Sequence, residues 1–189
     1  MKTETRKDEI IKTAANLFKE KGYSAVTMRD IAKAMGIKAA SLYNHINSKQ
    51  DILKGIIISL AEEFTIGMET IKASEVNTIE KLKQIISMHI RITNRNKAGM
   101  ACLNNDWMHL EDQLEYYLKL RINYEDNFRD TIRQGIIDDE ILNENLEVLL
   151  FSILSTLRSL YMWIPNKESF NEVELSQSLS NVLINGINK

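Results

Sequence analysis

Residues that break helices or form tight turns are scarce in this chain of 189 residues. Proline occurs once, at Pro165, and the seven glycines are never neighbours. Sandwiches, barrels and other loop-rich folds need turn residues at short intervals, so the scarcity argues against them. Apolar residues make up 44% of the chain, which is enough to bury a substantial core. We therefore expect an all-α fold.

Apolar residues recur at three- and four-residue steps along most of the sequence, which predicts about nine helices and no strand. We expect a three-helix head over residues 1–47 and a larger helical domain over residues 48–189. Pro165 is expected to end the eighth helix. The expected helices span residues 5–21, 28–35, 38–45, 50–72, 78–96, 98–110, 111–135, 146–164 and 172–186.

Charge is distributed unevenly along the chain, although the net charge is only −2. The first fifty residues hold ten Lys/Arg and five Asp/Glu, and the other 139 hold fourteen and twenty-one. A basic first quarter followed by an acidic remainder indicates that the N-terminal part faces a polyanion. Chance clustering of charges on solvated faces is the alternative.

Residues 26–46, VTMRDIAKAMGIKAASLYNHI, have the pattern of two helices joined by a short turn that contains glycine. Gly36 can take the left-handed conformation that a sharp turn needs, and Ala32 lets the two helices cross closely. Once the apolar positions are used for packing, the outward face of the second helix is narrow and polar, as insertion into a major groove requires. This face consists of Lys38, Ala39, Ser41, Tyr43, Asn44 and His45.

The order T-x-x-x-I-A-x-x-x-G-I-x-x-A-S-L-Y-x-H, followed by S-K-x-x-I-L, resembles the DNA-binding domain of the TetR family of bacterial transcriptional regulators. Two positions depart from the family pattern: Lys38 replaces the usual Ser or Thr helix cap, and Ile46 replaces the usual Phe. The alternative is an ordinary helical hairpin with Tyr43 in the core and Lys49 in solvent. The resemblance implies DNA contacts, mostly to the backbone, by Thr27, Ser41, Tyr43, His45 and Lys49, and base-edge positions for Lys38, Ala39 and Asn44. The full predicted DNA-binding set adds Met28, Arg29 and Ala40.

The last two expected helices are the best candidates for a dimer surface. Residues 146–163 are apolar on too many sides for a helix of a monomer. In the resembled family, two such helices pack against their symmetry mates as a four-helix bundle. The alternative is that both helices complete the core of one monomer. The predicted interface residues are Ser152, Ser155, Ser159, Leu175, Leu179, Val182 and Leu183.

Large and adaptable apolar side chains in the acidic remainder predict a cavity for a small ligand. In the resembled family, a small and often hydrophobic effector binds between these helices and moves the DNA-reading heads apart. Residues 160–186 also show a faint resemblance to members that sense acyl-CoA thioesters. The alternative is a solid core. The predicted pocket residues are Met68, Met88, Ile92, Met100, Trp107, Met108, Tyr117, Tyr124, Phe128 and Leu154.

Metal binding and catalysis are not expected, and neither is a cofactor. Cys102, Asp106 and His109 share one helix face and His89 could join them, but ligands spread over two turns do not converge on one ion. Isolated glycines exclude the dinucleotide and Walker phosphate loops, and no G-x-S-x-G elbow occurs.

The sequence as a whole predicts a dimeric, ligand-responsive repressor in the cytoplasm. A single cysteine favours a reducing compartment. The N-terminus lacks the apolar core of a signal peptide, and Arg158 interrupts the most apolar run, residues 148–157, before it reaches membrane-spanning length. Two other functions are open: an all-helical protein-interaction adaptor, and a small-molecule carrier without sequence-specific DNA binding.

Overall fold

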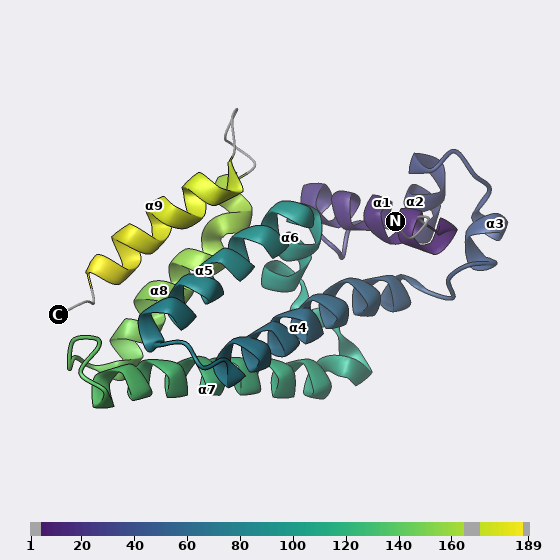
Figure 1. The fold of residues 1–189 in the computed structure, drawn as a ribbon. Helices are drawn as coiled ribbons and strands as arrows, with labels where there is room; N and C mark the ends of the chain where they lie inside the picture. The colour runs from purple at the N-terminus through teal and green to yellow at the C-terminus, as the bar shows by residue number, and fades with distance from the viewer. Residues whose placement is uncertain (1–4, 165–170, 187–189) are drawn as a thin grey trace. The chain divides into compact units, whose positions relative to one another are not determined.

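The computed structural model describes residues 5–164 and 171–186, and it confirms the all-α prediction (Figure 1). The expected break at Pro165 lies outside the described residues. The α-helices are α1 (Arg6–Lys21), α2 (Met28–Ala34), α3 (Ala39–Tyr43), α4 (Lys49–Ala73), α5 (Thr78–Arg95), α6 (Lys97–Asn105), α7 (Leu114–Ile137), α8 (Leu146–Trp163) and α9 (Glu172–Asn185). Two short 3₁₀ helices, η1 (Trp107–His109) and η2 (Glu111–Gln113), lie between α6 and α7.

The predicted helix over residues 98–110 was too long. The α-helix ends at Asn105, and the chain continues through the two 3₁₀ helices. Asn104, Asn105 and Asp106 are consecutive residues whose side chains compete for backbone hydrogen bonds and so favour a helix end. Glu111 adopts a positive φ of 46°, which lies outside the range of a right-handed α-helix. The next helix therefore begins at Leu114, three residues later than predicted.

Contacts between Cα atoms divide the chain into two compact units. The head unit contains Met1–Ala61 and Lys97–Leu118, and the core unit contains Glu62–Asn96 and Lys119–Lys189. The head unit thus includes α6 and both 3₁₀ helices as well as the first three helices. The predicted domain boundary between residues 47 and 48 stays a prediction.

In the head unit, α1 packs against α2 and α6, and α2 packs against α3. Ile10, Phe18 and Leu42 are fully or almost fully buried there. Thr5 begins α1 with a capping box, in which its hydroxyl accepts from the Asp8 N–H and the Asp8 carboxylate accepts from the Thr5 N–H. This box satisfies backbone donors that every helix start leaves without a partner.

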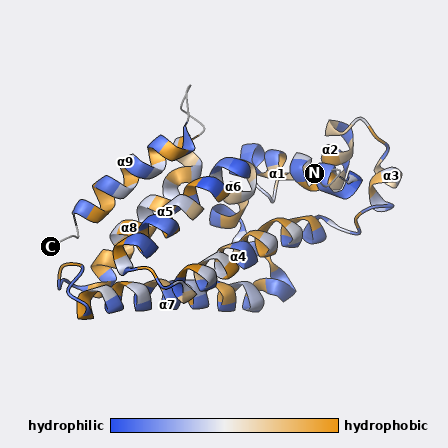
Figure 2. Ribbon diagram, viewed as in Figure 1, coloured by the Kyte–Doolittle hydropathy of each residue, from blue (hydrophilic) through white to orange (hydrophobic). Residues whose placement is uncertain are grey.

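In the core unit, α5 packs against α8 and α9. Hydrophilic and hydrophobic residues alternate along the ribbons of α5 and α9 (Figure 2). Nine of the α5 residues are buried, among them Leu82, Ile85 and Ile86. Amphipathic helices of this kind form because burial of the apolar face stabilises them.

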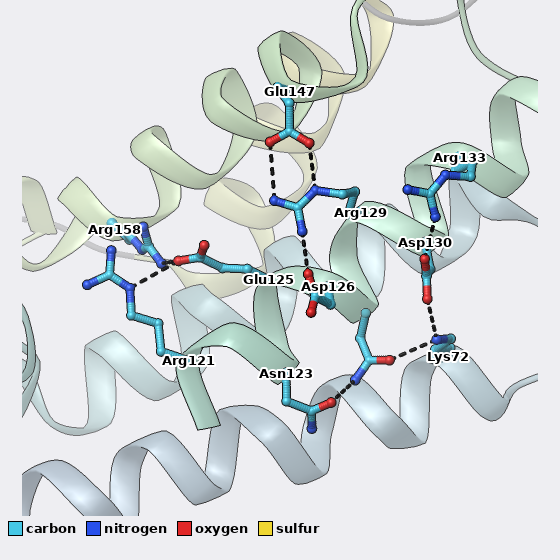
Figure 3. Close-up of polar contacts among 11 residues, drawn as sticks. Lys72, Arg121, Asn123, Glu125, Asp126, Arg129, Asp130, Arg133, Glu147 and Arg158 are labelled. Carbon is cyan, nitrogen blue, oxygen red and sulfur yellow. Dashed lines mark hydrogen bonds and ion pairs between the residues drawn. The ribbon is translucent and has the colours of Figure 1, made fainter. Parts of the chain in front are cut away.

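Charged side chains of α7 join neighbouring elements of the core unit (Figure 3). Arg129 binds Asp126 of its own helix at 2.5 Å and Glu147 of α8 at 2.6 Å. Asp130 accepts from Lys72 of α4 at 2.9 Å. Exposed pairs of this kind contribute little to stability, because water and salt screen them. They account for part of the acidic residues that the sequence places after residue 50.

Helix α8 is long and apolar enough to span a membrane, with a mean hydropathy of 1.3 over 18 residues, although only 33% of that segment is buried within the described chain. The sequence argument that Arg158 interrupts the apolar run therefore understated the length of the apolar helix. Arg158 is paired with Glu125 of α7, and Glu147 at the first turn is paired with Arg129 (Figure 3). Both charges of this helix thus have partners inside the core unit.

Candidate nucleic-acid interface

The predicted pair of helices begins at Thr27, which caps α2 with a complete capping box. The Thr27 hydroxyl accepts from the Asp30 N–H at 3.2 Å and donates to the Asp30 carboxylate at 2.6 Å. The same carboxylate accepts from the Thr27 N–H at 2.9 Å, and these bonds lower the pKa of Asp30. The hydroxyl proton of Thr27 is therefore held within the cap.

The turn between α2 and α3 has the left-handed glycine that the sequence predicts. Gly36 has a φ of 67°, which side chains other than glycine rarely adopt. The following Ile37 donates its N–H to the Ala32 carbonyl at 3.0 Å, and this bond closes the end of α2. The turn directs the next helix across α2 instead of continuing it.

The second helix of the pair is α3, which is shorter than the predicted span of residues 38–45. Lys38 occupies its N-cap position and makes no side-chain cap bond, as expected where a Ser or Thr is replaced. Leu42 is fully buried and anchors the helix. Tyr43 is 52% exposed, which excludes the alternative that it is a core residue. The other exposed residues of this face, hereafter the α3 face, are Lys38, Ala40, Ser41, Asn44 and His45, while Ala39 is half-buried.

The ammonium group of Lys49 is hydrogen-bonded within the head unit and is not part of the α3 face. Its Nζ donates to the carbonyls of Tyr23 and Val26, both at 2.9 Å, and lies 4.1 Å from the centroid of the Tyr23 ring. Two of its three N–H donors thus join the start of α4 to the loop after α1. Sequence reasoning placed Lys49 correctly at the α4 N-terminus, beside the capping residue Ser48, but a contact across 26 residues has no local signal.

Around Tyr23, polar groups hold the 3₁₀ segment to the rest of the head unit. The His109 ring stacks on Tyr23 with a centroid distance of 5.2 Å. Gln50 donates to the His109 carbonyl at 2.5 Å, and Lys54 pairs with Asp112 at 2.7 Å. The segment between α6 and α7 therefore contacts the first two turns of α4, which follows α3 in the chain.

The arrangement around Cys102 does not form a metal site. Cys102 is fully buried, and its thiol lies 3.9 Å from the Ala15 carbonyl. Burial, together with the nearby Asp106, raises the pKa of this thiol to about 12. Within residues 5–164 and 171–186, no group of three His, Cys, Asp or Glu side chains is placed to hold a metal ion. His89 belongs to the core unit, whereas Cys102 and His109 belong to the head unit.

The predicted pocket residues fall into two groups. Met100, Trp107, Met108 and Tyr117 belong to the head unit, where Trp107 stacks on Tyr117 at 5.8 Å. Met108 is 57% exposed, so it does not line an enclosed space. In the core unit, the other six predicted residues are all buried: Met68, Met88, Ile92, Tyr124, Phe128 and Leu154.

Polar side chains lie among these buried residues of the core unit. The His89 Nε2 is 2.6 Å from the Tyr124 hydroxyl, and the Phe64 ring lies 4.6 Å from the His89 ring. Sequence reasoning considered His89 only as a metal ligand and did not assign Thr93, which is fully buried. The available signal was their spacing of four residues on one apolar helix face.

The predicted dimer residues of α8 and α9 border an apolar groove of about 670 Å³ in the core unit. Of the seven predicted residues, Ser155, Ser159, Leu175, Leu179 and Val182 line it. Phe151, which the sequence did not assign to this surface, is 71% exposed on α8 but does not line the groove. The sequence signal for this exposure is that α8 is apolar on all sides, so some of its apolar residues must face outward. The remaining lining residues are Thr156, Leu160, Trp163 and Ser178.

Two family models match this chain. Residues 10–56 match bacterial regulatory proteins of the tetR family, and residues 75–187 match the tetracyclin repressor-like C-terminal domain. The first match contains the capped helices, the glycine turn and the α3 face. The second match covers more than half of the chain.

Two characterised relatives resemble most of the chain. The HTH-type transcriptional repressor KstR2 of Rhodococcus jostii is 25% identical over 151 residues, which is 79% of this chain and 74% of that protein. The fatty acid metabolism regulator protein of Bacillus subtilis is 28% identical over 186 residues, which is 95% of this chain and 94% of the relative.

Solved structures share the fold. The ketosteroid transcriptional regulator KstR2 of Mycobacterium tuberculosis aligns with a TM-score of 0.92 at 21% identity, over 100% of this chain and 97% of the other. AibR, solved in complex with isovaleryl coenzyme A and operator DNA, aligns with a TM-score of 0.79 at 21% identity, over 95% and 98%. Together with the match of both family models, these likenesses show that the chain belongs to the TetR family of bacterial regulatory proteins, which are DNA-binding transcriptional regulators and not enzymes.

Proposed function

We propose that this protein is a cytoplasmic repressor that binds a pseudo-palindromic operator as a homodimer and leaves it when a small hydrophobic effector binds. The observation that carries the proposal is the α3 face. Its polar side chains are exposed, while Leu42 on the opposite side of the helix is buried and anchors it. A narrow polar helix held by a sharp turn suits insertion into a major groove.

The proposed DNA contacts are those that the family resemblance implies for the residues of the α3 face. Lys38, Ala39 and Asn44 face base edges, while Ser41, Tyr43 and His45 contact the sugar-phosphate backbone. Met28, Arg29 and Ala40 complete the surface at its borders. Thr27 and Lys49 have intramolecular partners, so we assign their side chains mainly to holding the head unit in shape.

The groove between α8 and α9 supports pairing with a second copy of this chain. Its walls combine apolar residues with Ser155 and Ser159. Serine side chains are small, so they allow two helices to approach closely. A single helix-turn-helix binds DNA weakly, and two-fold pairing places two recognition helices on successive turns of a duplex. The four-helix bundle of the family would be formed by α8 and α9 of both protomers.

The effector is proposed to bind the core unit, among the buried methionine and aromatic residues predicted for the pocket. An acyl-CoA is the suggested class, because AibR was solved with isovaleryl coenzyme A and a relative is a fatty acid metabolism regulator. An effector lowers operator affinity only by the difference between its affinities for the released and the DNA-bound states. Helix α4, which contributes residues to both units, would transmit the change.

Operator binding can be measured with the DNA that flanks the gene of this protein. We expect a tight complex whose affinity falls about 10³-fold or more between 50 and 200 mM salt, because phosphate contacts release counterions. Tyr43→Ala should weaken it at least about tenfold, as loss of a phosphate contact would. Tyr116→Ala, which removes an exposed tyrosine at the start of α7, should not. Binding without salt dependence would instead favour the adaptor or the carrier.

A further inference from the structure

Two buried polar atoms on α5 have no hydrogen-bond partner among the described protein atoms: the Nδ1 of His89 and the hydroxyl of Thr93. His89 is 4% exposed and Thr93 is fully buried. Buried polar groups without partners destabilise a folded protein, and native structures retain few of them. Two on one helix face therefore require an explanation.

The surroundings of these atoms are apolar and aromatic. The Phe64 ring lies against His89 at 4.6 Å, and Tyr124 packs edge-on against both Phe64 and Phe128 at 5.9 and 6.3 Å. Burial, with a smaller contribution from the charge of Arg158, lowers the pKa of His89 to about 3. The imidazole is therefore uncharged at neutral pH, and the site offers hydrogen bonds without a compensating charge.

The two atoms are placed to act together. Residues four apart on an α-helix lie one above the other, with Cβ atoms about 5–6 Å apart. The phenol of Tyr124 stays protonated because burial raises its pKa, and it lies 2.6 Å from the His89 Nε2. When this hydroxyl donates to Nε2, the proton of the imidazole is on Nδ1. Nδ1 and the Thr93 hydroxyl are then two donors without partners, carried by residues four apart on α5.

We infer that His89 and Thr93 form the polar recognition point of the effector, and that they bind the uncharged carbonyl oxygen of an otherwise apolar ligand. This inference rests on the proposed function, because it places the effector in the core unit. A carbonyl oxygen has two lone pairs and accepts both donors, as ketones, esters and thioesters can. The Arg158 guanidinium, whose charge acts on His89, is already paired with Glu125. A carboxylate would therefore bring an unneutralised charge into apolar surroundings, so the site disfavours free fatty acids.

A methionine next to His89 on α5 packs against α4. Met88 is buried, and it lies so close to Gly67 that a Cβ there would be 2.3 Å from its sulfur. Met88 therefore fills the space that a side chain at Gly67 would occupy. Methionine is unbranched and adapts to different cavity shapes, so it can repack around a ligand.

The first test needs no ligand. Thr93→Val keeps the shape of the side chain and removes a buried hydroxyl that has no partner, so the melting temperature should rise by about 2–4 °C. The matched control is Thr131→Val, because the Thr131 hydroxyl is also buried but donates to the Asn127 carbonyl at 2.9 Å. Thr131→Val should lower the melting temperature. A fall of similar size in Thr93→Val would overturn the inference.

The second test measures binding of 2-octanone and of octanoate by isothermal titration calorimetry at pH 7. We expect saturable binding of the ketone and at least tenfold weaker binding of the carboxylate. Thr93→Val should weaken ketone binding about five- to tenfold, while Thr131→Val should leave it unchanged. No saturable ketone binding, equal binding of octanoate, or an unchanged affinity in Thr93→Val would each overturn the inference.

The operator experiment separates this inference from the proposed function. Wild-type protein and Thr93→Val should bind operator DNA equally in the absence of ligand, because the substitution lies in the core unit. Failure of both to bind any operator would overturn the proposed function while the ketone result stands. Normal operator binding combined with equal ketone binding by the two proteins would overturn this inference and leave the proposed function standing.

Discussion

The chain leaves two contrasting surfaces exposed, the α3 face in the head unit and the groove between α8 and α9 in the core unit. The α3 face presents an ammonium, hydroxyl, amide and imidazole groups around the half-exposed Tyr43. The groove presents Leu175, Leu179 and Val182, and Phe151 is exposed on α8. The first surface suits a hydrated polyanion and the second suits an apolar partner, so they require different occupants.

Binding at the two surfaces should also respond differently to salt. Contacts with phosphates release counterions, and their affinity falls steeply as salt rises. Burial of apolar surface is not weakened by screening, and sulfate strengthens it. We therefore expect salt to dissociate DNA from the protein well before it dissociates one protomer from another.

The largest expected effect comes from placing a charge in the groove. Val182 is 72% exposed in the single chain and lines the groove, so Val182→Glu would bury an unpaired carboxylate in the proposed dimer. Such burial costs several kcal/mol, and the dimer dissociation constant should rise at least about 100-fold. Sedimentation equilibrium measures this constant directly, and operator affinity should fall with it.

A matched substitution on the same helix distinguishes the groove from α9 in general. Val173 is 64% exposed in the first turn of α9 and does not line the groove. Val173→Glu should leave the protein dimeric, since the new carboxylate stays in water near a helix N-terminus. A dimer that tolerates Val182→Glu would show that the groove is not the contact between protomers.

The helices and the location of the head were predictable because their signals are local. Thr27 with Asp30, and Gly36 after a short helix, specify a capped helix and a left-handed turn without any tertiary information. The end of α6 was missed because apolar periodicity continues to Leu110, while the helix ends at a polar stretch before Asp106. Periodicity reports which residues are buried, and it does not distinguish an α-helix from consecutive 3₁₀ turns.

The roles of individual side chains were harder to predict, because they depend on contacts between distant residues. Lys49 looked like a phosphate contact from its place at a helix N-terminus, yet it donates to the carbonyls of Tyr23 and Val26. The unpartnered atoms of His89 and Thr93 became visible only when the side chains of the core unit were placed. A sequence shows which residues share a face but not which hydrogen bonds remain unmade.

The second largest effect tests whether Lys49 belongs to the exposed face or to the interior of the head unit. Lys49→Ala leaves two partly buried carbonyls without their charged donor, and it removes the ammonium above the Tyr23 ring. The free energy of unfolding should fall by about 1–3 kcal/mol in urea denaturation. The slope of log operator affinity against log salt should stay unchanged. A slope lower by about one unit would show that Lys49 contacts a phosphate.

The smallest effect is expected for Lys38→Ala, the counterpart of this change on the α3 face. Lys38 is exposed and makes no cap bond for α3, so its removal should leave the free energy of unfolding within about 0.5 kcal/mol of wild type. Because Lys38 is assigned to base edges, its removal should alter base preference and leave the slope of log affinity against log salt unchanged, measured by fluorescence anisotropy. A slope shallower by about 0.9 would instead show that its ammonium contacts a phosphate. Lys83→Ala, which removes an exposed lysine paired with Glu80 in α5, should change neither quantity beyond error. A change in base preference without a change in slope would mean that Lys38 reads a base edge and contacts no phosphate, since only phosphate contacts release counterions.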